Sequence, residues 1–340
     1  MKIGEIYFIG ERDRTDGGRS SYVKIGMVNS ITKDSTDRLR QHQTGNPRDL
    51  HLIHVTQTPG PFRVERFLHQ QFGASRVRSE WFRLADEEVA RAIQMAEQLA
   101  AEAFVHIPVI DEAELLGKVV STGQKIAATD ESIHWLRLLS EAKAALKWCA
   151  EMAGEYRSVA IELPEEVKEE AELEELFVSE HYVEKRFDAA GFAIRYPAVA
   201  AQFTEITRTV SGRFTPRCMK VDLVEVDPEL MFFAADFKNA CAEVNLGRMD
   251  FGELFDMRQR LEQFYGAYSW DEKIADSHLR VLCGDTSGIE GQVTWNRVAK
   301  ESSSLDEEGL ESSHPEEYRQ FVAVEMKTRI KTRRRARRKS

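Results

Sequence analysis

Two short strand patterns near the start of the chain limit its fold more than any other feature. Residues 3–10 are rich in β-branched and aromatic side chains and end at a glycine. Residues 22–27 repeat this pattern after a polar stretch that contains the turn signal Asp16-Gly17-Gly18. We therefore expect an antiparallel hairpin with a long polar loop.

The elements that follow the hairpin alternate between helix and strand. They are a helix over residues 32–43, a strand over 50–56, a helix over 62–72 and a short strand over 80–84. Asp34 is one of the candidate N-caps of the first helix. The order ββαβαβ predicts a small α+β domain, 1–84, with a three-stranded antiparallel sheet and flanking helices.

The rest of the chain reads as mainly α-helical. The expected divisions are a helical connector or hairpin over residues 85–160, a mainly helical domain of unknown role over 161–326 and a basic, disordered tail over 327–340. Asp227 and Pro228 form a good helix start, with an N-cap side chain followed by proline at the first helical position. A glutamate-rich stretch over residues 162–175 predicts a solvated helix face or a linker.

Composition argues against a membrane protein or a disulfide-stabilised secreted protein. Hydrophobic residues make up 42% of the 340 residues, and no run of 18 apolar residues occurs. The four cysteines lie far apart without a C-x-x-C pair, as in a reducing cytosol. The expected location is cytoplasmic.

The net charge of −10 conceals two basic regions. Residues 1–84 hold 14 basic and 9 acidic side chains, and residues 327–340 hold nine basic and no acidic ones. Both ends therefore favour polyanions such as nucleic acids, whereas the acidic middle of the chain does not.

Five side chains in the first 84 residues have the chemistry that phosphodiester hydrolysis needs. Tyr7 could hold its phenol near a scissile phosphate, and the charge of Lys24 could act on that phenol or on a water. Arg38 offers a planar fork for phosphate oxygens, and His42 lies four residues later on the same helix face. Glu65 is a hard oxygen donor suited to one Mg²⁺.

Each of these residues is ordinary by itself, and their order and spacing carry the hypothesis. The combined motifs are Glu5-Ile6-Tyr7, Tyr22-Val23-Lys24-Ile25-Gly26, Arg38 with His42, Glu65, and the closing Ser79-Glu80-Trp81-Phe82. Together they resemble the GIY-YIG endonuclease family, over about a quarter of the chain. The closing motif and the Lys before Ile-Gly are similar to one branch of that family.

The resemblance implies specific roles for these residues. Tyr7 would activate water, Arg38 would stabilise the transition state, and Glu65 would bind Mg²⁺ or Mn²⁺. Lys24 stands in place of the second-motif tyrosine, and His42 matches a histidine that only some branches have. The first motif is Glu-Ile-Tyr rather than Gly-Ile-Tyr, and the loop between the motifs is long, but neither difference removes a chemical group.

The sequence thus predicts a metal-dependent nuclease, a hydrolase acting on DNA, with RNA as an alternative substrate. Residues 85–326 are expected to serve targeting, partner contact or homo-oligomer formation. The alternative is a nucleic-acid-binding protein or an interaction scaffold in which the nuclease module is inactive or accessory. His69, four residues after Glu65, either steadies that carboxylate or simply packs in the core.

Overall fold

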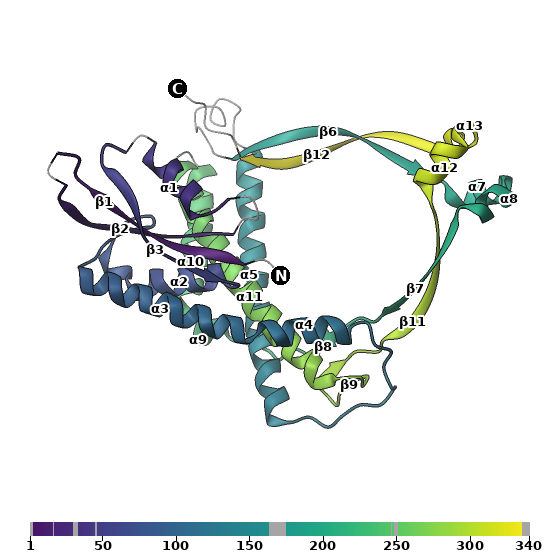
Figure 1. Cartoon of the computed structure of the whole chain (residues 1–340), viewed down its shortest axis with the longest axis horizontal. Coiled ribbons are helices and arrows are strands. Elements are labelled where there is room, and N and C mark those ends of the chain that lie inside the picture. The colour runs from purple at the N-terminus through teal and green to yellow at the C-terminus, as the bar shows by residue number, and fades with distance from the viewer. Residues whose placement is uncertain are drawn as a thin grey trace.

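The fold is described from a computed structural model, which consists of an N-terminal sheet module, long central helices and two β-ribbons whose strands alternate with the helices along the chain (Figure 1). The structure describes residues 3–15, 17–29, 33–44, 46–162, 175–245, 247 and 251–334. The glutamate-rich stretch, apart from its two ends, and residues 335–340 of the basic tail lie outside this described part.

The N-terminal module is built on a five-stranded antiparallel sheet of order β3-β1-β2-β5-β4. Its strands are β1 (Gly4–Arg12), β2 (Arg19–Val28), β3 (Asp49–Thr58), β4 (Arg76–Arg78) and β5 (Trp81–Arg83). The four predicted strands are present as β1, β2, β3 and β5, and β4 was not predicted, so the sheet has five strands rather than the predicted three. The predicted α+β class is confirmed.

Alternation along β1 gives the sheet two buried faces. Ile6 and Phe8 point into one core, which also contains Val64 and Leu68 of α2 (Pro61–Gln71). Tyr7 and Ile9 point to the opposite face, which α1 (Ser35–Gln43) covers. The sheet therefore separates α1 from α2.

Local sequence signals explain where these two helices begin. Asp34 is the N-cap of α1: its side chain accepts a hydrogen bond from the backbone N–H of Asp37, and the Asp37 side chain accepts one from the backbone N–H of Asp34. Helix α2 starts with Pro61 directly after Gly60, as is common for a proline at the first helical position. The 3₁₀ turn η1 (Gly73–Ser75) then leads into β4.

Helix α3 (Asp86–Val105) belongs to the core of the module. Val89, Ala92 and Ala96 are buried against the same face of the sheet as α2. Apolar side chains from the start of the expected connector thus complete the core of the module, and without them this face of the sheet would be exposed.

The central part of the chain is a set of packed helices. They are α4 (Ile107–Leu116), α5 (Asp130–Glu162), α9 (Leu223–Val226), α10 (Pro228–Asn245) and α11 (Phe251–Cys283). The predicted helix start is confirmed, since the Asp227 side chain accepts from the backbone N–H of Leu230 at 3.0 Å. Helices α5 and α11 pack along each other, and α11 also packs against α2 of the module.

Two β-ribbons within the helical region were not predicted. Strand β6 (Glu175–Phe187) pairs with β12 (Val322–Arg334), and β7 (Thr204–Ser211) pairs with β11 (Val298–Leu305). The paired residues are between 87 (Val298 and Ser211) and 159 (Arg334 and Glu175) positions apart along the chain, so local sequence patterns predict such strands poorly. The ribbons reach away from the central helices to a distal cluster (Figure 1).

The distal cluster holds four short helices around buried Phe192, Leu310 and Tyr318. These helices are α7 (Ala189–Arg195), α8 (Pro197–Gln202), α12 (Glu307–Ser313) and α13 (Pro315–Arg319). Three two-residue strands, β8 (Thr215–Pro216), β9 (Gly288–Ile289) and β10 (Val293–Thr294), form a small sheet near the other end of the β7–β11 ribbon (Figure 1).

The basic tail differs from its prediction over part of its length. Residues 327–334 lie in β12 and pair in register with β6, rather than forming a disordered segment. Alternating β-branched residues in this segment suit a strand once a partner strand is present. Among the described helices, none is both long and apolar enough to cross a membrane.

Candidate active site

The candidate site lies at the point along strand β2 where its pairing with β5 ends. Strand β5 pairs with β2 over Tyr22, Val23 and Lys24, and the last contact is a hydrogen bond from the N–H of Ile25 to the carbonyl of Glu80. Beyond that point, side chains from α2 take the place of a strand. His69 Nε2 lies 2.9 Å from the carbonyl oxygen of Ile25.

Tyr7 and Gly26 face each other across β1 and β2. A Cβ atom at Gly26 would lie only 2.4 Å from the Tyr7 hydroxyl oxygen. Glycine is therefore required at this position because the tyrosine ring lies directly over its backbone. Tyr7 itself is buried, with 2% of its surface exposed.

Lys24 forms a buried ion pair with Glu80. Only 6% of the Lys24 surface is exposed, so its charge needs a partner inside the protein. Burial by itself would raise the pKa of the Glu80 carboxyl, but the charge and hydrogen bond of Lys24 outweigh burial and hold that pKa below its usual range. Ser79, with φ of 50°, makes the tight turn just before this carboxylate.

Glu65 reaches the site from α2 with 2% of its surface exposed. Its carboxylate accepts from the backbone N–H of Met27, at the open edge of β2, and from Gln263 Nε2 at 3.0 Å. Burial, followed by the negative charge of Glu80, raises the pKa of Glu65 well above its usual range. Lys24 opposes this shift only in part because it is paired with Glu80.

The surroundings of Tyr7 keep it protonated. Burial raises the pKa of its phenol most, and the carboxylates of Glu80 and Glu65 raise it further. Arg38 acts in the opposite direction, which places its positive charge near the phenol. Tyr7 is thus a hydrogen-bond donor at neutral pH, and a further positive charge nearby would be needed to ionise it.

Arg38 approaches the site from α1, on the opposite side of the sheet from α2. Its Nη1 lies 3.2 Å from Gln41 Oε1, whereas its buried Nε has no hydrogen-bond partner in the part of the chain that the structure describes. Burying an unsatisfied donor is costly, so this nitrogen is suited to an incoming anion. The ring of His42, one turn later, lies 6.5 Å from the Tyr7 ring.

His69 lies in the core beneath the site and is 4% exposed. Since a carbonyl oxygen only accepts, the contact with Ile25 places the proton of His69 on Nε2 and leaves Nδ1 as an acceptor, 3.5 Å from Gln263 Nε2. Burial lowers the pKa of His69 to about 4. Both sequence-based alternatives for His69 therefore hold in part: it is packed in the core, and it is linked to Glu65 through Gln263.

The structure brings all five predicted residues to this one region of the sheet, Tyr7 and Lys24 from strands, Arg38 and His42 from α1, and Glu65 from α2. Two further residues belong to it. Glu80 lies in the closing motif. It could have been predicted from the sequence, because a buried lysine such as Lys24 needs an acidic partner. Gln263 follows no motif, and nothing in the sequence marks it.

The acidic groups fit a single divalent cation with few protein ligands. Within the described ranges, no cluster of three or more His, Cys, Asp or Glu side chains could hold a metal. Glu65 is a hard donor whose charge no ion pair balances directly, because Lys24 is engaged by Glu80. Mg²⁺ in phosphoryl-transfer sites often uses one or two carboxylates, with waters and phosphate oxygens completing its shell.

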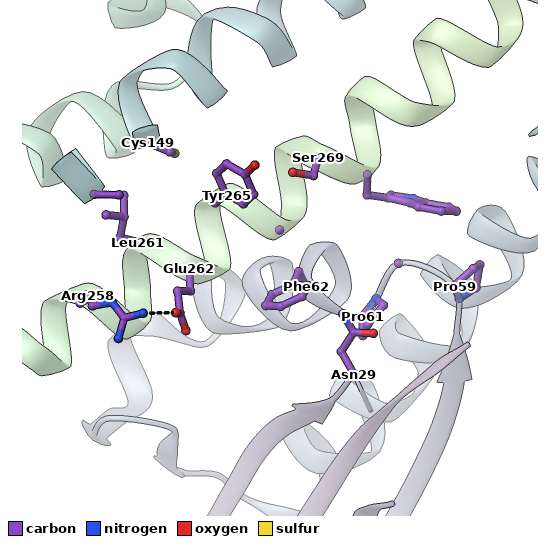
Figure 2. A pocket seen from close by; sticks show the side chains of 14 residues that line it. Asn29, Pro59, Pro61, Phe62, Cys149, Arg258, Leu261, Glu262, Tyr265 and Ser269 are labelled. Carbon is purple, nitrogen blue, oxygen red and sulfur yellow. Dashed lines mark hydrogen bonds and ion pairs between the residues drawn. The ribbon is translucent and has the colours of Figure 1, made fainter. Parts of the chain in front are cut away.

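A cavity of about 730 Å³ lies beside the site, between the start of α2 and helices α5 and α11. Figure 2 shows Phe62 of α2 facing Tyr265 and Ser269 of α11 across it. The Arg258–Glu262 ion pair, 2.8 Å between Nη2 and Oε1, lies at one end. The cavity has a mainly apolar lining and includes none of the five predicted site residues.

A family described as the T5orf172 domain matches residues 4–97 of the chain. The match spans the five-stranded sheet, α1, α2 and the first half of α3, in agreement with the extent of the module core. No curated protein and no solved structure gives a match. Residues 4–97 are thus similar to a nuclease-type domain, and the chain beyond them has no matched relative.

Proposed function

We propose that this chain is a divalent-metal-dependent endonuclease of the GIY-YIG type that hydrolyses phosphodiester bonds in DNA. One observation supports it best: the phenol of Tyr7 lies within electrostatic reach of both the buried carboxylate of Glu65 and the guanidinium group of Arg38, whose Nε has no hydrogen-bond partner among the described residues. The match to a nuclease-type domain supports the same class of function independently.

The side chains on the two faces of the sheet would have different roles. Arg38 would donate through its unpaired Nε–H to a phosphate oxygen, which would satisfy the buried donor and stabilise charge that grows in the transition state. His42, on the same helix, is suited to contact the same phosphate. The Lys24–Glu80 pair holds a positive charge within the site without exposing it to solvent.

Tyr7 would orient the attacking water through its hydroxyl group. Burial and the negative charges of Glu80 and Glu65 keep its phenol protonated, so Tyr7 could accept a proton from that water only after releasing its own proton to solvent, which requires an added positive charge nearby. Glu65 would hold Mg²⁺ or Mn²⁺, and the bound ion would supply this positive charge and polarise the phosphate. The basic character of residues 1–84 suits a polyanionic substrate.

The test is a cleavage assay with supercoiled, linear, branched and single-stranded DNA, and RNA, in Mg²⁺ and in EDTA. Wild type should nick or cut at least one DNA substrate only with metal, and Glu65→Gln and Tyr7→Phe should each lose about 100-fold or more in rate. Exposed Glu87→Gln and the partly exposed Tyr22→Phe serve as matched controls and should keep activity. If wild type cleaves none of these substrates, the proposal is refuted.

A second candidate is nucleic-acid binding without turnover. This candidate is supported by the low accessibility of Glu65. Only 2% of its surface is exposed, and its carboxylate already accepts two hydrogen bonds. Gel-shift assays on the same substrates separate the two proposals. If the protein only binds nucleic acid, the DNA should be retarded in the gel and should stay uncut with Mg²⁺ or Mn²⁺.

A further inference from the structure

The candidate site contains one side chain from outside the matched domain. Gln263 lies on α11, and 198 positions along the chain separate it from Glu65. Its Nε2 donates to Glu65 Oε2 at 3.0 Å and lies 3.5 Å from His69 Nδ1. A glutamine amide carries two N–H groups, so one side chain can serve both acceptors.

These contacts form a continuous chain of hydrogen bonds across the α2–α11 interface. His69 donates to the carbonyl of Ile25 on the edge of β2, Gln263 donates to His69, and the same amide donates to Glu65. The Nε2–H tautomer of His69 leaves Nδ1 free to accept, so Gln263 is held as a donor to both neighbours.

Neighbouring contacts keep α11 in place. Gly266 lies against the ring of Phe62, where an added Cβ would be 2.2 Å from a ring carbon. Arg66 of α2 forms an ion pair of 2.5 Å with Asp227, and its guanidinium group lies 4.4 Å from the centre of the Phe264 ring. Phe264 and Gly266 follow Gln263 by one and three residues, so α11 is held against α2 next to the Gln263 amide.

We propose that Gln263 is a positioning residue for Glu65, so that the helical region completes the active site of the N-terminal domain. A carboxylate offers about four lone-pair sites. The donors on Gln263 and Met27 occupy two of them and fix the orientation of the group, while the remaining lone pairs stay available to a cation. This inference rests on the proposed metal-dependent function, and it assigns α11 a direct part in it.

The consequence is that residues 4–97 by themselves hold an incomplete site. Hydrogen-bond partners of metal-binding side chains typically contribute 10- to 100-fold to metal affinity. Loss of the Gln263 donors should therefore weaken the metal site even though the residues of the matched domain are unchanged.

The experiment compares the full-length wild type with Gln263→Leu, which keeps similar volume and removes both donors. Binding of Mn²⁺, measured by electron paramagnetic resonance or calorimetry, should weaken about 10-fold or more. The metal concentration for half-maximal cleavage should rise in parallel. Gln263→Ala should behave alike, and Gln259→Leu, an exposed position one turn away on the same helix, should match wild type.

Melting temperature and the His69 tautomer, read from ¹⁵N-histidine spectra, separate positioning from general damage. Unchanged Mn²⁺ affinity in folded Gln263→Leu or Gln263→Ala would overturn the inference while cleavage by wild type upholds the proposed function. An equal loss in Gln259→Leu would also overturn it. If wild type neither binds Mn²⁺ nor cleaves DNA, the proposed function fails, and this inference fails with it.

Discussion

The two helices that flank the candidate site are held in very different ways. Helix α1, which carries Arg38 and His42, buries only one residue, Ser35. Helix α2, which carries Glu65 and His69, buries five residues and lies between the sheet and α11. Only the second helix is held from both sides.

This difference suggests that α2 holds the carboxylate in a fixed position, whereas α1 leaves room for the substrate to approach. The carboxylate side is fixed by hydrogen bonds from β2 and α11, as a metal ligand requires. On the other side, Arg38 of α1 is only partly buried as a residue, and its buried Nε has no hydrogen-bond partner among the described residues. A substrate phosphate would therefore approach from α1, and damage to the α2 side should affect folding more than damage to the α1 side.

The largest effect is expected at Asp227, which holds α2 to the helical region. Asp227→Ala leaves the mostly buried charge of Arg66 without its closest partner and removes the N-cap of α10. The free energy of unfolding should fall by about 4 kcal/mol in chemical denaturation. Asp227→Asn, which keeps a cap acceptor, should lose less, and exposed Asp236→Ala on the same helix should lose almost nothing. An Asp227→Ala protein as stable as wild type would mean that α2 is not held by this pair.

Arg38→Ala tests the other helix. The rate of DNA cleavage should fall by about 100- to 1,000-fold, as for the loss of one transition-state donor, while the melting temperature stays close to that of wild type. Arg40→Ala removes an exposed arginine two positions along and is the matched control. A large loss of stability in Arg38→Ala would contradict the contrast between the helices.

The burial of His69 predicts a pH dependence on the α2 side. Its pKa is about 4 in the folded protein against about 6.5 when unfolded. The unfolded state therefore binds more protons between these values, so stability is lost as pH falls from 6.5 towards 4, by up to about 3 kcal/mol. Denaturation in EDTA should show this loss in wild type and much less of it in His69→Gln.

His54→Gln is the control for that measurement. His54 is partly exposed and lies 3.2 Å from Glu97, so its replacement should leave the acid-side loss in place. If His69→Gln keeps the full pH dependence of wild type, His69 is not the group responsible.

The smallest effect is expected at Ser79, on the turn that presents Glu80. Its φ of 50° is unusual for a residue with a Cβ, and glycine adopts it without strain. Ser79→Gly should raise the free energy of unfolding by at most about 1 kcal/mol and leave cleavage unchanged. Ser75→Gly, in the preceding 3₁₀ turn, should not stabilise, because no such strain is present there. A clear loss of stability in Ser79→Gly would show that the turn is unstrained.

The sequence predicted the parts of the module that depend on local patterns. Runs of β-branched and aromatic residues marked the long strands, Asp34 marked the start of a helix, and the spacing of Tyr7, Lys24 and Glu65 pointed to one site. The apolar face of α3 does not show in the sequence which partner it covers, so the contribution of this helix to the core of the module was not predicted.

What the sequence determined by itself is the set of chemical groups and the elements that carry them, because periodicity and caps act within a few residues. Tertiary structure alone decided which distant groups meet them. The Lys24–Glu80 pair, the ribbons and the Gln263–Glu65 contact all join residues far apart in the chain. Such contacts depend on packing between helices and sheets, on which local sequence patterns carry no information.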